Sequence, residues 1–302
     1  MAGLVEPLLE HLAALIPSTD AGRIVGILRD TPVSETRSVL LEIALPPAAP
    51  ACDLSLLLQD RARPILISPA RTLNVARVLQ NVASGPVWWE YDTSTPQAPA
   101  APFVWTRDIG ESVMAALESF SGGVKAAQRL FDLTEPVVQT SASLVGIFAE
   151  REPPAVSRVF GIATEDAPGA IEALRPFVTH VVNYELPIAR HLLATCEAAR
   201  ISVSMTVSGV STASIEVFAS ASTRPRPNTW NRVLDAPQVW GGLTEVMLNL
   251  LATQRIHVFS SLVPAIMYLG VSHLKLTATG HVKVYLTLHP FVHTEQRSTA
   301  RH

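Results

Sequence analysis

Residues 272–289 read SHLKLTATGHVKVYLTLH, and polar and apolar side chains alternate on both sides of Gly280. Strict alternation around a glycine predicts a β-hairpin with one polar face and one apolar face. A three-residue loop at residues 278–280 keeps the two faces separate and places the glycine where a left-handed backbone is favoured. This closing hairpin, the last in the chain, sets the pattern for the fold.

The predicted register brings charged and aromatic side chains together on the polar face. Lys275 lies opposite Lys283, and His273 lies opposite Tyr285. Like charges directly across a ladder normally destabilise it, and the chain has only three lysines in 302 residues. An anion held between the two amines accounts for the pair. The alternative is that both lysines extend into solvent.

Composition narrows the classes of function. The chain is 48% hydrophobic and 16% charged, with a net charge of −3, which is typical of a globular protein. This charge argues against general binding to nucleic acid or to an anionic membrane. Two cysteines are too few for a disulfide scaffold or a thiolate zinc site. Because no secretion signal and no apolar run of ~20 residues occur, we expect a cytoplasmic protein.

Further segments of the chain repeat the hairpin pattern. Residues 201–208 and 214–218 alternate around a Gly209 turn, and residues 22–28 and 37–45 read as an earlier hairpin. The pattern predicts four strands of this kind besides the closing hairpin.

Helical segments separate the hairpins. Residues 109–120 and 124–131 predict a helix pair, so the order is helix, helix, strand, strand. We expect a single domain over residues 1–302, built of two similar halves at about 1–135 and 144–302.

The polar strand face indicates how the sheet is arranged. Hairpins joined by helices place the helices on the apolar side of the sheet. An open, water-facing sheet usually carries more charge and guarded edges. We therefore expect an α+β fold: an antiparallel β-barrel or strongly curved sheet with a polar inner face, covered outside by helices in αββα-type repeats.

Charged side chains on the predicted strands are the candidate site residues. Glu216 lies on the polar face, where a carboxylate can act as a base. Glu90 lies in the aromatic segment 88–91, where burial raises the pKa of a carboxyl. Arg158 and Arg37 are candidates to join the lysines around a diphosphate. For each of these residues the alternative is an ordinary surface or structurally paired charge.

Sequence motifs for familiar catalytic and metal sites are absent. The sequence contains no His-Glu-x-x-His zinc pattern, nucleophile elbow or nucleotide-binding glycine loop. His273, His281 and His289 share a strand face without a carboxylate, which is a poor metal signature. We expect no bound metal at these residues.

The repeat order, the polar strand face and the closing hairpin resemble the aromatic prenyltransferases of the ABBA barrel class. Lys275, Lys283 and Tyr285 match the terminal Lys-x-Tyr pattern of that family. The resemblance implies that these residues, with His273 beside them, bind the diphosphate of an allylic isoprenoid. It also implies that an aromatic or peptide acceptor receives the isoprenoid.

Other residues match this family in general placement. Arg37 and Arg158 correspond to its diphosphate-binding arginines, and Glu216 corresponds to the carboxylate that orients the acceptor. The resemblance implies that Glu216 or Glu90 accepts a proton late in the reaction. It makes no cofactor certain; Mg²⁺ bound with the diphosphate is the candidate.

A second resemblance points to a different role. Residues 88–92 and 102–103, together with the closing hairpin, are similar to a group of uncharacterised bacterial proteins that accompany peptide-modifying enzymes. This resemblance implies a place in bacterial secondary metabolism and association with other biosynthetic enzymes. The alternative function is a non-prenylating protein that binds or cyclises a ribosomal peptide in the same cavity. A scaffold protein without a cavity is the third class.

Overall fold

The computed structural model describes residues 18–30, 36–45, 52–58, 75, 87–93, 100–106, 111–139, 142–219, 230–240, 254–259 and 264–291. Its strands are β1 (Thr36–Ala44), β2 (Cys52–Leu58), β3 (Val87–Tyr91), β4 (Ala100–Thr106), β5 (Ser143–Phe148), β6 (Ala155–Ile162), β7 (His180–Val181), β8 (Ala198–Thr206), β9 (Ser211–Phe218), β10 (Gln254–Phe259), β11 (Pro264–Leu276) and β12 (Val282–Phe291).

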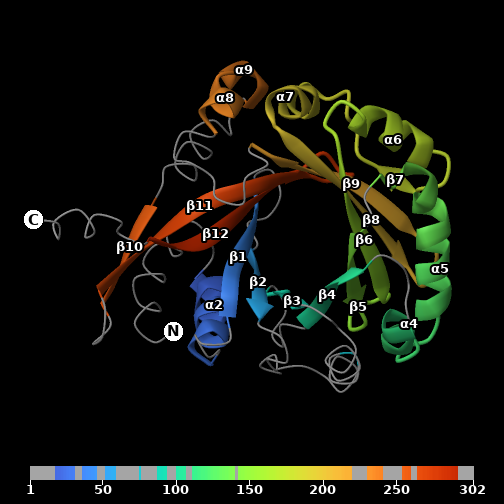
Figure 1. Cartoon of the computed structure of the whole chain (residues 1–302), viewed down its shortest axis with the longest axis horizontal. Coiled ribbons are helices and arrows are strands. Elements are labelled where there is room, and N and C mark those ends of the chain that lie inside the picture. Colours follow the sequence, from blue (N-terminus) through green and yellow to red (C-terminus); the bar gives the residue numbers. More distant parts are fainter. Residues whose placement is uncertain are drawn as a thin grey trace, which may run out of the picture.

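Ten of these strands close into an antiparallel barrel (Figure 1). The pairing runs from β11 through β12, β1, β2, β3, β4, β5, β6 and β8 to β9, and β9 pairs with β11 to complete the ring. The two remaining strands extend the sheet, since β10 pairs with β11 and the two-residue β7 pairs in parallel with β9. The predicted antiparallel barrel of an α+β fold is therefore confirmed.

The closing hairpin, β11 and β12, has the predicted register. His273 pairs with Tyr285 and Lys275 pairs with Lys283. Gly280 has a φ of 81°, and its amide donates a hydrogen bond to the Thr277 carbonyl at 3.0 Å. The left-handed conformation favours glycine at this turn.

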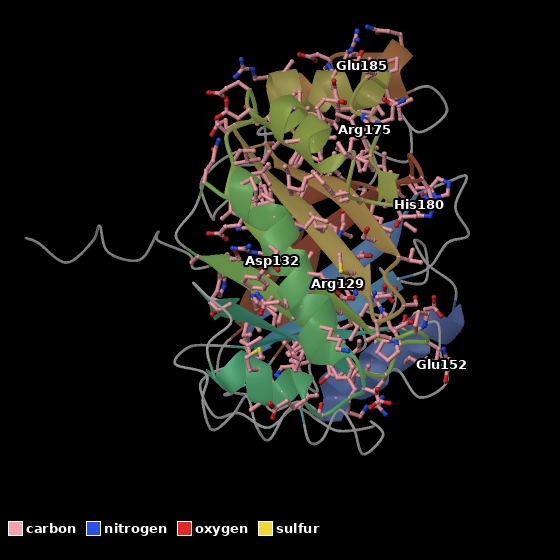
Figure 2. All side chains as sticks on the ribbon, turned by 90° about the vertical axis from the view of Figure 1, so that its right-hand side faces the viewer. Arg129, Asp132, Glu152, Arg175, His180 and Glu185 are labelled. Atoms are coloured by element: carbon pink, nitrogen blue, oxygen red, sulfur yellow. The ribbon has the colours of Figure 1, made fainter. Side chains whose placement is uncertain are left out.

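The described helices are α2 (Ser18–Asp30), α4 (Glu111–Leu117), α5 (Gly123–Thr134), α6 (Ala167–Leu174), α7 (Pro187–Thr195), α8 (Asn231–Leu234) and α9 (Pro237–Trp240), with a 3-10 turn η2 (Glu135–Val137). Helix α5 contacts β6 and β8 from outside the barrel. It buries Leu130 and Phe131 against the strands, while Arg129 and Asp132 lie on its exposed side (Figure 2). None of the described helices combines the length and the apolar character needed to cross a membrane.

One secondary-structure prediction is wrong. Residues 22–28 are helical, because Ile24, Ile27 and Leu28 fall on one face of α2 and are buried there. Strand β1 therefore pairs with β12 and β2. Strand β5 begins at Ser143, at the start of the expected second half, and pairs with β4 and β6.

The outward face of the strands forms the apolar core. In β8 the side chains of Ile201, Val203 and Met205 are buried among other apolar groups. Ser202 and Ser204 alternate with them and line the interior of the barrel. The period-two pattern therefore gives every ring strand an inner face that forms a cavity.

Candidate functional site

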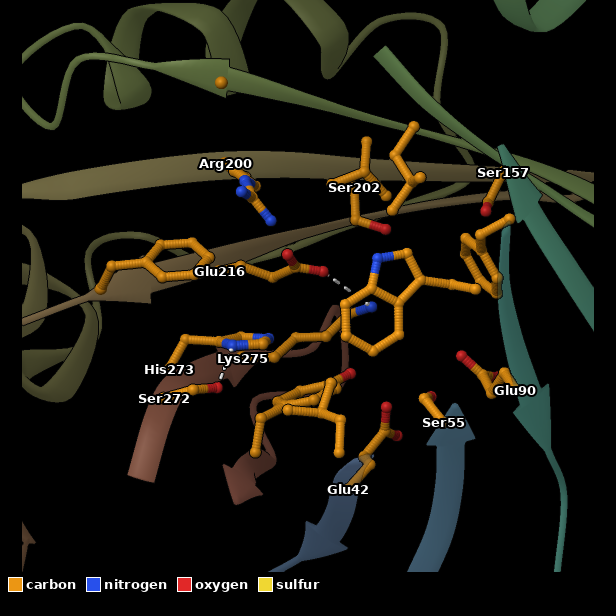
Figure 3. Close-up of a pocket in the computed structure, with 18 of the residues that line it drawn as sticks. Glu42, Ser55, Glu90, Ser157, Arg200, Ser202, Glu216, Ser272, His273 and Lys275 are labelled. Carbon is orange, nitrogen blue, oxygen red and sulfur yellow. Dashed lines mark hydrogen bonds and ion pairs between the residues drawn. The ribbon is translucent and has the colours of Figure 1, made fainter. Parts of the chain in front are cut away.

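A cavity of about 960 Å³ lies inside the barrel. Side chains from all ten ring strands line it, and its charged lining residues are Glu42, Glu90, Arg151, Arg200, Glu216, Lys275 and Lys283. Six of the predicted site residues are brought together here: Glu90, Glu216, His273, Lys275, Lys283 and Tyr285. Several of them converge on one space from opposite walls (Figure 3).

The two facing lysines are each neutralised by a carboxylate of the protein. Lys275 Nζ lies 3.5 Å from Glu216 Oε1, and Lys283 Nζ forms an ion pair and hydrogen bond with Glu42 Oε1. Their side chains are 21% and 33% exposed, so neither lysine extends freely into solvent. Separate carboxylates on neighbouring strands allow the two like charges to face each other.

The pKa of Glu42 is strongly lowered by its neighbours. Burial alone raises the pKa of a carboxyl. The charges of Lys283 and Lys275 and hydrogen bonds from Lys283 and Tyr285 outweigh burial and lower the pKa of Glu42 to about 2. In return, the charge of Glu42 overcomes burial and raises the pKa of Lys283. The ion pair is therefore fully formed at neutral pH.

The pKa values of Glu90 and Asp53 are raised, whereas that of Glu42 is lowered. Burial, followed by the charge of Glu42, raises the pKa of Glu90, although Arg151 Nη2 lies 3.1 Å from its Oε1. This is the direction of shift expected for a carboxyl buried in the aromatic segment. Asp53 lies directly across from Glu42, and burial with that charge raises its pKa to about 8. Asp53 is thus predominantly protonated at pH 7.

A stack of rings forms another part of the wall. The His273 ring lies between those of Phe218 and Tyr285, with centroids 4.7 and 4.0 Å away. Its Nδ1 lies 2.8 Å from Ser272 Oγ. Burial lowers the pKa of His273 to about 4, so the stack carries no histidine charge at neutral pH.

The opposite wall is rich in aromatic rings. Trp88, Phe103, Trp105 and Phe148 line it, and the rings of Phe103 and Phe148 meet edge to face at 5.4 Å. This wall gives the cavity an apolar side opposite the lysines. A row of serines borders it, namely Ser55, Ser157, Ser202 and Ser204.

Ser157 has a buried hydroxyl at the edge of this wall. Its hydroxyl is buried and has no hydrogen-bond partner within the described part of the chain, although it points into the cavity (Figure 3). A buried hydroxyl without a partner carries a desolvation cost. A ligand atom at this position would recover that cost.

One of the two predicted arginines, Arg158, does not join the lysines. Arg158 is on the outer face of β6, beneath α5, where it hydrogen-bonds Ser143 Oγ at 3.0 Å and Thr134 Oγ1 at 2.8 Å. Its guanidinium also lies 4.1 Å from the Phe131 ring centroid. Its neighbours Ser157 and Val159 face the cavity, so strand alternation turns Arg158 outward. Arg37 is the second residue of β1, but its side chain is outside the described residues.

Glu42, Arg151 and Arg200 are site residues that the sequence prediction missed. Glu42 shares a face with Ser38 and Leu40 in the alternation of β1, and that pattern was the available signal. Its partner Lys283 is 241 residues away, so the pairing depends on barrel closure. Arg151 follows β5, a strand that was not predicted.

The described residues do not form a metal cluster. No three His, Cys, Asp or Glu side chains gather as ligands in the part of the chain that the structure describes. Glu42, the central carboxylate of the site, is held by Lys283 and Tyr285. These residues do not fit a protein-held Mg²⁺ site.

The chain matches no protein-family model and no curated protein. The function is therefore inferred from the chemistry of the cavity.

Proposed function

We propose that this protein transfers an isoprenoid group from an allylic diphosphate to an aromatic or peptide acceptor. The observation that carries the proposal is the two-sided cavity of about 960 Å³. Lys275, Lys283 and Tyr285 provide hydrogen-bond donors on one side, and Trp88 and Phe103 provide apolar rings on another. An allylic diphosphate has the same division between an anionic head and an apolar tail.

The lysine wall supports binding of the diphosphate. An ammonium has three N–H donors, so an ion pair with one carboxylate leaves donors for a second anion. Charge-assisted hydrogen bonds from Lys275, Lys283 and Tyr285 would stabilise the negative charge that develops on the departing diphosphate. The pKa of Tyr285 is raised well above its usual value by burial and by Glu42, so its hydroxyl stays protonated. Its single O–H, which donates to Glu42, would turn toward the diphosphate.

The transfer step forms one bond and breaks one. The allylic C–O bond breaks and its electron pair leaves with the diphosphate, while a ring carbon of the acceptor bonds to the allylic carbon. The ring then loses a proton to Glu216 or Glu90. The raised pKa of Glu90 makes its carboxylate a stronger base, and the faces of Trp88 and Phe103 would stabilise an allylic cation.

The peptide-binding alternative is favoured by a different observation. Glu216 and Glu42 already neutralise the two lysines, so the cavity can hold a ligand without a diphosphate. A non-prenylating protein that binds or cyclises a ribosomal peptide would use the same walls. We also propose that helices cover the barrel in αββα repeats. The protein would act in secondary metabolism, in association with other biosynthetic enzymes.

Calorimetric titration of geranyl diphosphate tests the transfer proposal. We expect saturable binding to the unmodified protein and at least about 10-fold weaker binding to Lys275→Met and Lys283→Met, since each removes a charge-assisted hydrogen bond. Lys125→Met is the matched control, because the third lysine is exposed on α5. Absence of saturable heat with the unmodified protein would remove the diphosphate role and leave the peptide-binding alternative.

A further inference from the structure

One end of the barrel forms the mouth of the cavity. Trp105, next to last in β4, lines the cavity and is 49% exposed. The register joins Trp105 to Leu144 at the start of β5, and Gly161 at the end of β6 to Arg200 near the start of β8. These residues line one end of the cavity, and the exposure of Trp105 shows that this end is open.

Arg200 is held at this mouth by two aromatic rings. Its guanidinium carbon lies 4.6 Å from the ring centroid of Phe218 and 5.7 Å from that of Trp105. Residue 161, opposite Arg200 on β6, is a glycine, so no side chain from that position covers the guanidinium. Stacking on rings restrains a guanidinium while leaving its N–H donors available.

Arg200 differs from the other cations of the cavity. Lys275, Lys283 and Arg151 each form an ion pair with a glutamate. No carboxylate among the described residues forms an ion pair with Arg200, and its cross-strand neighbour Glu216 pairs with Lys275 instead. A half-buried guanidinium without a carboxylate partner in the described part of the chain is suited to a planar oxyanion, which it can bind through two parallel hydrogen bonds.

We propose that Arg200 binds a carboxylate of the acceptor, so that the acceptor is an aromatic carboxylic acid. Free aromatic amino acids and peptides that end in an aromatic residue share this chemistry. The inference rests on the proposed function and names the acceptor class of the same cavity.

The position of Arg200 also sets the direction of the acceptor. Lys275 is next to last in β11 and Lys283 is second in β12, so both lie toward the end of the barrel away from the mouth. Glu216 is the cross-strand neighbour of both Arg200 and Lys275. Neighbouring strands lie about 4.8 Å apart, so a carboxylate at Arg200 places the attached ring beside the proposed proton acceptor, Glu216.

Binding of two probes without any diphosphate tests this inference. Calorimetry with the full chain would compare indole-3-propionate with indole. We expect the carboxylate to improve affinity about 10-fold, because a hydrogen-bonded charge pair is formed. In Arg200→Gln the two probes should bind equally, and Arg200→Lys should keep part of the preference. Arg129→Gln, on the outer surface of α5 (Figure 2), is the control and should keep all of it.

Further results show separately whether the inference fails and whether the proposed function fails. Equal binding of the two probes to the unmodified protein overturns the inference, whatever the variants do. Loss of geranyl diphosphate affinity in Arg200→Gln also overturns it, because Arg200 would then be a diphosphate ligand. A carboxylate preference in a protein that does not bind geranyl diphosphate supports the inference and contradicts isoprenoid transfer. Tryptophan and N-acetyltryptophan distinguish a free amino acid from a peptide C terminus, and tighter binding of either than of indole supports the carboxylate site.

Discussion

Lys283, near the end of the chain, forms an ion pair with Glu42 of β1, 241 residues earlier. On the other side of the closing hairpin, Lys275 forms an ion pair with Glu216 of β9. The two lysines therefore attach β12 to β1 and β11 to β9, at the two seams that complete the barrel. The same pairs set the charge of the cavity, so barrel closure and ligand chemistry depend on the same four side chains.

Replacing Glu42 with Gln should lower the free energy of unfolding by about 2 kcal/mol, less than for a fully buried pair because Lys283 is partly exposed. The loss arises because Lys283 keeps its charge without a carboxylate partner. Urea unfolding of Glu42→Gln, Lys283→Met and the double variant measures the coupling. We expect the double variant to be more stable than the sum of the single effects predicts. Strict additivity would contradict the ion pair.

The closing hairpin shows what the sequence can predict. Its alternation and Gly280 determine the register locally, so the Lys275–Lys283 pairing followed directly from residues 272–289. Glu42 was missed because its role depends on a seam between the first and last strands of the barrel. Arg158 was misplaced for another reason. Both faces of β6 are largely buried, and its apolar pattern therefore does not tell the inner face from the outer one.

Asp53 should make stability fall as the pH rises. Burial and the charge of Glu42 raise its pKa to about 8, whereas the unfolded chain titrates near the ordinary value of about 3.9. Between these values the folded state binds more protons, so the stabilising contribution of Asp53 is complete below pH 4 and is lost toward pH 8. When one proton titrates, the free energy of unfolding changes by at most about 1.4 kcal/mol per pH unit.

Asp53→Asn removes this titrating group and should flatten the slope between pH 5 and 8. Urea midpoints at several pH values, measured in parallel for both proteins, provide the comparison. Parallel curves for Asp53→Asn and the unmodified protein would show that the Asp53 carboxyl is not protonated in the folded state.

Gly146 should not tolerate a methyl group. A Cβ at this position would lie 2.5 Å from the Phe103 ring and 2.7 Å from Ser157 Oγ. Gly146→Ala should therefore lower the free energy of unfolding by about 1–3 kcal/mol, the usual cost of overpacking. Gly169 in α6 has nothing within 4 Å of an added Cβ, and Gly169→Ala should raise stability by about 0.5–1 kcal/mol. Equal effects of the two substitutions would contradict close packing at Gly146.

Arg158 should contribute to stability without contributing to ligand binding. Its side chain is 3% exposed, and burial lowers its pKa, with Glu135 opposing the shift. Arg158→Met would leave the hydroxyls of Thr134 and Ser143 without this donor and should lower the free energy of unfolding by about 2 kcal/mol. Geranyl diphosphate affinity, measured by calorimetry below the unfolding transition, should not change. A loss of affinity as large as that of Lys283→Met would mean that Arg158 reaches the cavity, which its hydrogen bonds beneath α5 contradict.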